Sequence, residues 1–532
     1  MMTDTDQILR AARAAYRAAP PVGDSAYELY CRELARGLTS AWPEVIRANE
    51  RDVDAALRRG LPDTLVGRLR LTDRHLDYLV ALTVEAAGAL SAISEPEPGV
   101  RVGDWGVLYK VPKPLGVALM IYEARPTVSV EGALLPVAVG NAVLLRGGKE
   151  IGATNAALAE VIRAALVASG LPGDMVTLLA DPDRSVLRAL LSRADAVDVL
   201  IPRGSPSLID YCRTNSTIPL IASGGGVNHL YVHNSADLDL AALATLDSKL
   251  PEPSACNTVE LVLVDESVAE DFVARLLRHA ERGGEPVTVK LDAALPMPAQ
   301  GDGPWRVARM EPYDTGREFL DPTVAVLPVT GPRAAIEHIR THGSAHTEGV
   351  IAGDRAVIED FTRRVDAAAI VVNGSLRLHD GNTLELGAEV SISTGRLHVR
   401  GPVGMRSLLT YTWVVEANGT LRATADGSAH SNEQEHTEMS TVDDIDHASV
   451  AESVKRVVIA ESRLPLRPSD VADDEPLNGD LLRVNSLGFL GMLVRLEDEL
   501  SIQLPDDLFV GRSFATVADL VAVVLTASAV HR

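Results

Sequence analysis

The stretch VPKPLGVALMIYEARPTVSVEGALLPVAVGNAVLLRGGKE, residues 111–150, decides the fold class of this chain. It holds two short apolar runs, GVALMIY at 116–122 and NAVLLRG at 141–147, with a segment of helical spacing between them. Strands that are apolar throughout and alternate with helices belong to parallel sheets, whose crossover helices cover both faces. The stretch therefore predicts a strand–helix–strand unit of an α/β fold.

The same alternation continues toward the carboxyl end of the chain. Further strand candidates are MVTLLA (175–180), AVDVLIPRG (196–204) and HLYV (229–232). A second series of short apolar runs and helical segments extends from about residue 232 to 389, and residues 393–416 close it. We therefore expect two α/β regions, residues 1–232 and 233–416.

The segments before the first unit have different patterns. Residues 3–92 repeat apolar side chains at a spacing of three or four, which predicts helices. Residues 102–116 alternate and contain glycines, which predicts a hairpin.

The composition changes after residue 416. Residues 417–444 are rich in Ala, Ser, Thr, Asn and Glu and poor in apolar side chains, so we expect a flexible linker. Residues 445–532 regain helical spacing, which predicts a small helical bundle. Residues 417–532 hold 9 Lys and Arg against 20 Asp and Glu, so the tail is a separate acidic unit.

Charge and cysteine content exclude several classes of protein. The net charge of −23 argues against a nucleic-acid-binding protein, which needs clustered Lys and Arg. The three cysteines, Cys31, Cys212 and Cys256, have neither metal-site spacing nor a disulfide framework, which favours a reducing, cytoplasmic compartment. No stretch approaches about 20 consecutive apolar residues, so we expect no membrane span and no signal peptide.

Several ordered stretches together resemble γ-glutamyl phosphate reductase, a branch of the aldehyde dehydrogenase superfamily. Besides residues 111–150, they are DVLIPRGSPSLI (198–209), IASGGGVNHLYV (221–232), PSACNTVE (253–260), FLDPTVAVLPV (319–329), EHIRTHGSAHTEGVI (337–351) and STGRLHVRGPVG (393–404). The resemblance implies an aldehyde-dehydrogenase-like fold with a Rossmann-type cofactor domain and a catalytic cysteine domain. It also implies a homo-oligomer, a dimer or larger, with the 102–116 hairpin as one contact.

Cys256, in PSACNTVE, matches the nucleophile of that family. The resemblance implies that its thiolate attacks an acyl phosphate, phosphate leaves, and hydride from NADPH converts the thioester to an aldehyde. Thiolates attack acyl centres well, which suits this role; a small buried hydrophobic residue is the alternative. Ala222 matches the glutamate with which oxidising relatives activate water, so a thioester here should survive until hydride arrives. Cys31 and Cys212 lie outside any such motif and are interpreted as structural.

The resemblance also assigns cofactor contacts. Gly204 and Ser205 match the turn that contacts the dinucleotide, where backbone amides at a helix N-terminus suit pyrophosphate. Arg146 and Lys149 match the adenosine ribose region, where cations favour NADPH; a solvated loop is the alternative. Glu318 matches a residue that holds the nicotinamide ribose.

Four further residues are candidates for the acyl site. The planar guanidinium of Arg125, in YEARP, suits a phosphate or carboxylate. Asn257 could polarise the acyl oxygen or simply stabilise a turn. Arg400 is a candidate for a structural contact or for the substrate carboxylate. For Lys249 a surface position is the favoured interpretation.

Two departures from the family pattern fall near the expected substrate pocket. Glu252 stands where the family usually has arginine, and residues 371–381 match loosely, although Ser375 and Arg377 are retained. These changes leave glutamate itself in doubt as the acyl group and permit a related amino or carboxy acyl group.

Residues 473–509 and 514–520 resemble an acyl carrier protein, a four-helix bundle. The resemblance implies that Ser486 carries 4′-phosphopantetheine at a helix N-terminus, where the dipole favours the phosphodiester. Asn485 replaces the usual aspartate, and an N-cap serine in a pure docking module is the alternative.

The first hypothesis is an NADPH-dependent acyl-phosphate reductase with a fused carrier, acting in specialised metabolism. Its expected partners are a phosphopantetheinyl transferase and an upstream kinase or acyl-loading enzyme. A reductase acting on carrier-bound thioesters and a non-catalytic scaffold with a docking tail are the alternatives.

Overall fold

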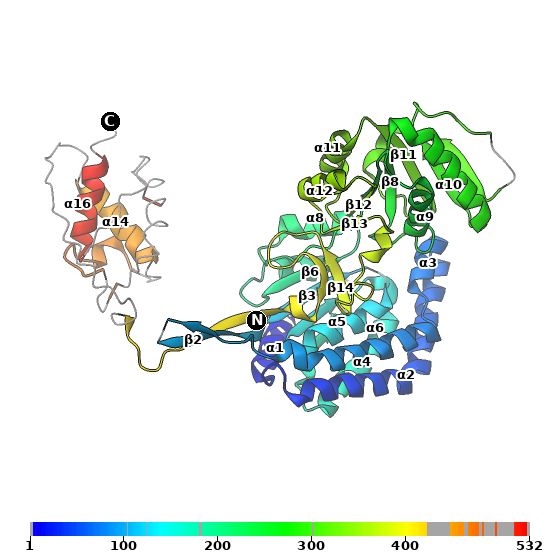
Figure 1. Ribbon diagram of the computed structural model, residues 1–532. Helices are drawn as coiled ribbons and strands as arrows, with labels where there is room; N and C mark the ends of the chain where they lie inside the picture. The colour runs from blue at the N-terminus through cyan, green and yellow to red at the C-terminus, as the bar shows by residue number, and fades with distance from the viewer. Residues whose placement is uncertain are drawn as a thin grey trace. The chain divides into compact units, whose positions relative to one another are not determined.

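The computed structural model describes residues 4–103, 105–123, 125–179, 184–299, 303–422, 447–461, 466–477, 481–482, 495–496 and 515–528. The chain divides into two compact units, Met1–Ala425 and Asp426–Arg532 (Figure 1). The first unit contains two parallel sheets, two small antiparallel sheets and the helices that pack against them.

The first sheet has four parallel strands in the order β5-β4-β3-β6. Their bounds are β3 Val117–Tyr122, β4 Ala142–Arg146, β5 Val176–Leu178 and β6 Val199–Arg203. The two apolar runs of the opening stretch form β3 and β4, and every residue of β3 is buried because helices cover both of its faces. The crossover helices are α5 Pro126–Ala138, α6 Gly152–Ala168 and α7 Arg184–Leu191.

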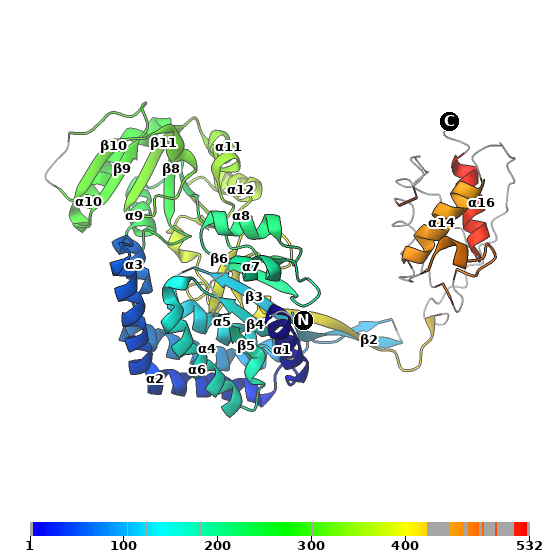
Figure 2. The same ribbon diagram turned by 180° about the vertical axis from the view of Figure 1, so that it is seen from behind.

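Helices α5 and α6 cover one face of this sheet, and α2 Ser25–Arg58 and α4 Asp73–Ser94 pack against them (Figures 1 and 2). Helix α1 Asp4–Ala18 packs with α7 on the opposite face, and the short α3 Asp63–Leu69 lies between α2 and α4 in sequence. The longest, α2, packs against α4 and α6 and buries Tyr27, Tyr30 and Leu34 among the largest side chains of the core. By length and composition alone, helix α4 and the segment Lys149–Ala168 are long and apolar enough to cross a membrane. Both, however, pack against α2 inside this unit.

The second sheet has seven parallel strands in the order β10-β9-β11-β8-β7-β12-β13. Their bounds are β7 Asn228–Val232, β8 Val259–Asp265, β9 Val287–Leu291, β10 Trp305–Arg309, β11 Thr323–Val329, β12 Thr347–Ile351 and β13 Ala369–Val372. The helices α9 Leu238–Lys249, α10 Ala269–Gly283, α11 Pro332–His342 and α12 Arg355–Arg364 complete this region, whereas α8 Pro206–Asn215 follows β6 and packs against the first sheet.

Two small antiparallel sheets join distant parts of the chain. Strand β2 (Gly106–Pro114) pairs with β1 (Val100–Val102) and, over eight residue pairs, with β16 (Leu409–Glu416). Figure 1 shows β2 projecting from the body, and Tyr411 and Trp413 on β16 are 51% and 52% exposed. Strands β14 (Glu389–Ser393) and β15 (Gly401–Gly404) form the other pair.

The second unit has its own apolar core. Helices α14 (His447–Glu461) and α16 (Val517–Ser528) pack together, and Val454, Val458, Leu520 and Val524 are buried between them. The helix expected to begin at Ser486 lies outside the described residues.

Candidate active site

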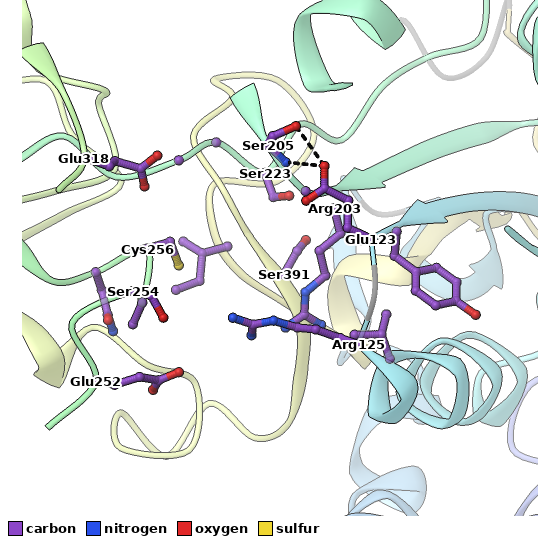
Figure 3. A pocket seen from close by; sticks show the side chains of 18 of the residues that line it. Glu123, Arg125, Arg203, Ser205, Ser223, Glu252, Ser254, Cys256, Glu318 and Ser391 are labelled. Carbon is purple, nitrogen blue, oxygen red and sulfur yellow. Dashed lines mark hydrogen bonds between the residues drawn. The ribbon is translucent and has the colours of Figure 1, made fainter. Parts of the chain in front are cut away.

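A pocket of about 360 Å³ opens in the first unit, at the carboxyl ends of β3 and β6. Its walls come from segments far apart in sequence: the turns after β3 and β6, the glycine run 223–225, the loop of Cys256, and strand β14. Figure 3 shows the thiol of Cys256 facing the side chains of Arg125, Arg203 and Ser391. The parallel topology thus brings most of the sequence-predicted stretches to one place.

The Cys256 loop is a turn between α9 and β8, and side chains fix it at several points. The side-chain amide of Asn228 donates to the carbonyls of Cys256 and Thr258, at 2.8 and 2.7 Å. The backbone N–H of Ala255 donates to the carbonyl of Glu252 at 3.0 Å. Among the described residues, the backbone N–H groups of Cys256 and Asn257 have no acceptor, so both remain available to a bound oxyanion.

The glycines of SGGG make room for this loop and for Glu318. A Cβ on Gly226 would lie 1.6 Å from the carbonyl oxygen of Cys256, and a Cβ on Gly225 would lie 2.4 Å from the carboxylate of Glu318. That carboxylate accepts a hydrogen bond from the N–H of Gly226 at 2.8 Å. The motif is therefore explained by close approach, since any side chain would displace the nucleophile or Glu318.

The thiol of Cys256 is partly exposed, and burial raises its pKa to about 11. Arg203 and Arg125 act in the opposite direction, and Glu389 adds to the effect of burial. The thiol therefore rests in its protonated form at neutral pH, and the two arginines favour the thiolate.

Arg203 and Arg125 have different surroundings. Arg203 donates to the carboxylate of Glu131 and to the carbonyl of Val390, both at 2.8 Å. Arg125 has no ion pair with any residue that the structure describes, and burial, Arg203 and Arg68 lower its pKa. A guanidinium held among like charges without an acidic partner is a receptor for an anion.

The predicted dinucleotide turn contains a carboxylate of the chain itself. The backbone N–H and the hydroxyl of Ser205 donate to Glu123, at 3.1 and 2.8 Å (Figure 3). A Cβ on Gly204 would lie 2.7 Å from the Glu123 carboxyl carbon. Ser205 is the N-cap of α8, so Glu123 stands where we expected pyrophosphate.

Arg146 and Lys149 lie at the same edge of the sheet. Arg146 ends β4, in register with Ile121 of β3, and the exposed Lys149 begins a short 3-10 helix. Neither belongs to the described residues that line the pocket. Their role at the adenosine ribose stays a prediction.

The side chain of Asn257 is engaged in holding loops together. Its amide donates to the carbonyl of His379 at 2.9 Å, and its oxygen accepts from Arg377. Arg377 in turn donates to Glu252 at 2.9 Å. This arrangement favours the turn-stabilising alternative for Asn257, and it explains why Arg377 accompanies a glutamate at position 252.

Lys249 and Arg400 lie away from the positions expected for them. The prediction that Lys249 lies on the surface is wrong: it is 0% exposed and forms an ion pair with Glu260 at 2.8 Å. Arg400 donates to Asp366 at 2.6 Å and is not among the described residues that line the pocket, which supports its structural alternative. Cys31 and Cys212 are buried in the two cores that flank the first sheet.

The sequence interpretation missed five charged residues that line the pocket: Arg68, Glu123, Arg203, Asp380 and Glu389. Glu123 and Arg203 lie inside the quoted motifs, YEARP and IPRGS, where the polar residue at the end of an apolar strand was an available signal. Burial raises the pKa of Glu389 to about 8, with Asp380 as the next cause, so this carboxyl is protonated at neutral pH. Arg68 had no such signal.

Comparison with known proteins agrees with this geometry. The model of the aldehyde dehydrogenase family matches residues 4–294, more than half of the chain, and that of the phosphopantetheine attachment site matches residues 457–524. The chain therefore belongs to the aldehyde dehydrogenase family and carries a phosphopantetheine-attachment domain, as the sequence predicted.

Within that family the chain is similar to γ-glutamyl phosphate reductases. It is 39% identical to that of Glaesserella parasuis over 398 residues, which cover 73% of this chain and 92% of the relative. It is 39% identical to that of Chloroflexus aggregans over 429 residues, 79% of this chain and 100% of the relative. The crystal structure of the Thermotoga maritima γ-glutamyl phosphate reductase matches with a TM-score of 0.72 at 30% identity, covering 79% of this chain and 100% of that one.

Proposed function

We propose that the first unit reduces an activated acyl group, of the γ-glutamyl-phosphate type, to an aldehyde through a thioester on Cys256. The observation that carries the proposal is the placement of a fixed cysteine loop against two arginines in one pocket. The similarity to γ-glutamyl phosphate reductases supports the same reaction.

The proposed reaction has two stages. The Cys256 thiolate attacks the acyl carbon, the C–O bond to phosphate breaks, and Arg125 receives the negative charge of the leaving group. The N–H groups of Cys256 and Asn257 stabilise the oxyanion of each tetrahedral intermediate. Hydride then adds to the thioester carbon and the C–S bond breaks, which releases the aldehyde and the thiolate.

We propose NADPH as the hydride donor. The turn of Gly204 and Ser205 and the carboxylate of Glu318 suit a dinucleotide, because they line the pocket, the turn begins helix α8, and a carboxylate can accept from ribose hydroxyls. Glu123 must first give up its hydrogen bonds to Ser205.

The carboxyl groups of the pocket favour reduction over hydrolysis of the thioester. Five of them line it among the described residues: Glu123, Glu252, Glu318, Asp380 and Glu389. The first four accept hydrogen bonds from Ser205, Arg377, Gly226 and the backbone N–H of Thr383, and Glu389 is protonated at neutral pH. The position of Ala222 offers no base, and each of the four charged carboxylates is already engaged by a hydrogen-bond donor of the chain in this structure.

Measurement in the reverse direction tests the reaction and identifies the acyl donor. A phosphate-dependent reduction of NADP by glutamate 5-semialdehyde, or by a related aldehyde, supports the acyl-phosphate reductase. Dependence on a pantetheine thiol instead supports the second candidate, a reductase of carrier-bound thioesters, which the attachment domain in the same chain favours.

Cys256→Ala should abolish the reaction, and Cys212→Ala, in a buried structural position, should retain it. Activity that persists in Cys256→Ala would refute the mechanism. If no aldehyde is active with the wild type, the third alternative, a scaffold with a docking tail, gains support.

We further propose that the second unit is a four-helix carrier bundle with 4′-phosphopantetheine on Ser486. The attachment-site match supports this role, and the enzyme would then act in the cytoplasm in specialised metabolism with an acyl-loading enzyme or kinase. Co-expression with a phosphopantetheinyl transferase should add about 340 Da to the wild type, the mass of the arm on a serine hydroxyl. No gain, or the same gain in Ser486→Ala, would contradict the assignment.

A further inference from the structure

A second depression, of about 220 Å³, adjoins the active-site pocket. Arg125, Arg68, Glu252 and Ser254 line both spaces, so the two are continuous. The outer part is lined, among others, by Arg70 from the segment that joins α3 to α4, by His75 in the first turn of α4, and by the start of α5. We name this outer depression the basic antechamber.

The antechamber has an excess of positive charge. The guanidinium groups of Arg68, Arg70 and Arg125 form no ion pair or hydrogen bond with any residue in the part of the chain that the structure describes. The acid among its described lining residues is Glu252, and Arg377 already binds this carboxylate at 2.9 Å. Like charges gathered in a concave, partly buried site stabilise a bound anion and are costly without one.

His75 adds a neutral hydrogen-bond donor. Its Nδ1 accepts the backbone N–H of Thr72 at 3.0 Å. Because an N–H can only donate, the proton of the neutral ring lies on Nε2, which is left to donate to a ligand. Three guanidinium forks and an imidazole N–H around one depression suit the several acceptor oxygens of a phosphate better than a single carboxylate.

A solvated basic surface is the simpler alternative for these residues. Arg70 by itself fits that alternative, since it is exposed, but Arg68 and His75 are only partly exposed. All three line a depression that leads to the pocket of Cys256. In a depression they can surround one ligand together, which residues on a convex surface cannot do.

We propose that the basic antechamber binds a phosphate group of the incoming acyl donor, and this inference rests on the proposed function of Cys256. Two donors carry such a group. In an acyl phosphate the phosphoryl group is attached to the reacting carbonyl, so Arg125 and Arg68 would hold it. In a carrier thioester the phosphodiester lies at the far end of the pantetheine arm, so Arg70 and His75, farther out, would hold it.

The test uses protection of Cys256 from alkylation, which requires no reductase activity. The wild type is treated with iodoacetamide in the presence of inorganic phosphate, of 4′-phosphopantothenate, or of chloride at equal ionic strength. We expect a phosphate compound to slow alkylation of Cys256 and chloride to have no comparable effect. Arg68→Gln should raise the half-protecting concentration of inorganic phosphate, and Arg70→Gln that of 4′-phosphopantothenate, each about tenfold, the effect of losing one charge-assisted contact worth about 1.4 kcal/mol.

Arg74→Gln is the matched control, because Arg74 is an exposed arginine four residues away that lines neither space. Stronger protection by inorganic phosphate identifies the acyl phosphate as the source, and stronger protection by 4′-phosphopantothenate identifies the arm. The inference is overturned if neither protects, or if Arg68→Gln and Arg70→Gln both behave like Arg74→Gln. A wild type that reduces its substrate but shows no protection would refute the antechamber alone and leave the proposed function intact.

Discussion

The ionisation of Cys256 gives the sharpest quantitative test of the site. Burial raises the pKa of this thiol from 9.0 to about 11, against the opposing effect of Arg203 and Arg125. At pH 8 a thiol with a pKa of 9 is about 10% ionised, and one with a pKa of 11 is about 0.1% ionised. Because only the thiolate is alkylated, Cys256 should react about 100-fold more slowly at pH 8 than an unperturbed thiol.

The assay is the pseudo-first-order rate of iodoacetamide alkylation from pH 6 to 10, read by peptide mass spectrometry. The rate at Cys256 should rise about tenfold per pH unit throughout this range, because the thiolate fraction does. Cys31 and Cys212 are fully buried and serve as internal controls that should stay unmodified while the protein is folded. Arg125→Gln should slow the reaction further, because a cation that favours the thiolate is lost.

A rate that is already constant between pH 6 and 8 would refute this reasoning, because it would mean that the thiol is ionised in the resting protein. A rate that is unchanged in Arg125→Gln, with Arg74→Gln as the exposed control, would show that Arg125 has no electrostatic effect on the nucleophile.

Three further predictions concern the packing around the site. Gly226→Ala should lower activity about 100-fold or more, because the added Cβ would displace the carbonyl of Cys256 and small misplacements of a nucleophile are costly. Gly152→Ala, with nothing within 4 Å of the added carbon, is the control and should be nearly neutral. Equal turnover of the two variants would contradict this reasoning. Lys249→Met should reduce the free energy of unfolding by about 3–5 kcal/mol in denaturant titrations, because it leaves the charge of Glu260 buried without its partner. Adding Glu260→Gln should restore part of this stability, because a lone buried charge costs more than a missing pair. A Lys249→Met variant as stable as the wild type would be inconsistent with a charged pair. The folded-state pKa of Glu389, about 8, lies above its ordinary value of 4.5, so the protonated carboxyl stabilises the wild type at low pH and this effect is lost as the pH rises through 8. The Tm of Glu389→Gln relative to that of the wild type should therefore be higher at pH 9 than at pH 5. A difference in Tm that does not depend on pH would refute the pKa shift.

The first parallel sheet could be predicted because its central strands are apolar throughout. Runs such as 116–122 and 141–147 can be buried on both faces only between helices, and they form β3 and β4. The glycine run before β7 could also be recognised in the sequence. The structure explains it, because a Cβ on Gly225 or Gly226 would collide with Glu318 or with the carbonyl of Cys256.

Pairings between distant residues could not be predicted. Lysine is usually a surface residue, so the sequence favoured an exposed position for Lys249. Its burial depends on the ion pair with Glu260, which lies on β8, after the Cys256 loop. Arg68 and Glu389 are more than 300 residues apart, and no local pattern indicates that both line one pocket. Glu123 could be seen as a polar strand end, but its bond to Ser205 depends on the register of β3 against β6.

The pairing of β2 with β16 has a consequence for the order of events during synthesis. Tyr109 on β2 hydrogen-bonds to Glu416 on β16, 307 residues later. At about 5–20 residues per second a ribosome needs roughly 15–60 s to bridge that interval, and during this time β2 has only β1 as a partner. An unsatisfied strand edge that persists so long is a template for pairing with other nascent chains. Selection should therefore act on the translation speed and chaperone capture of this chain as well as on its catalytic residues.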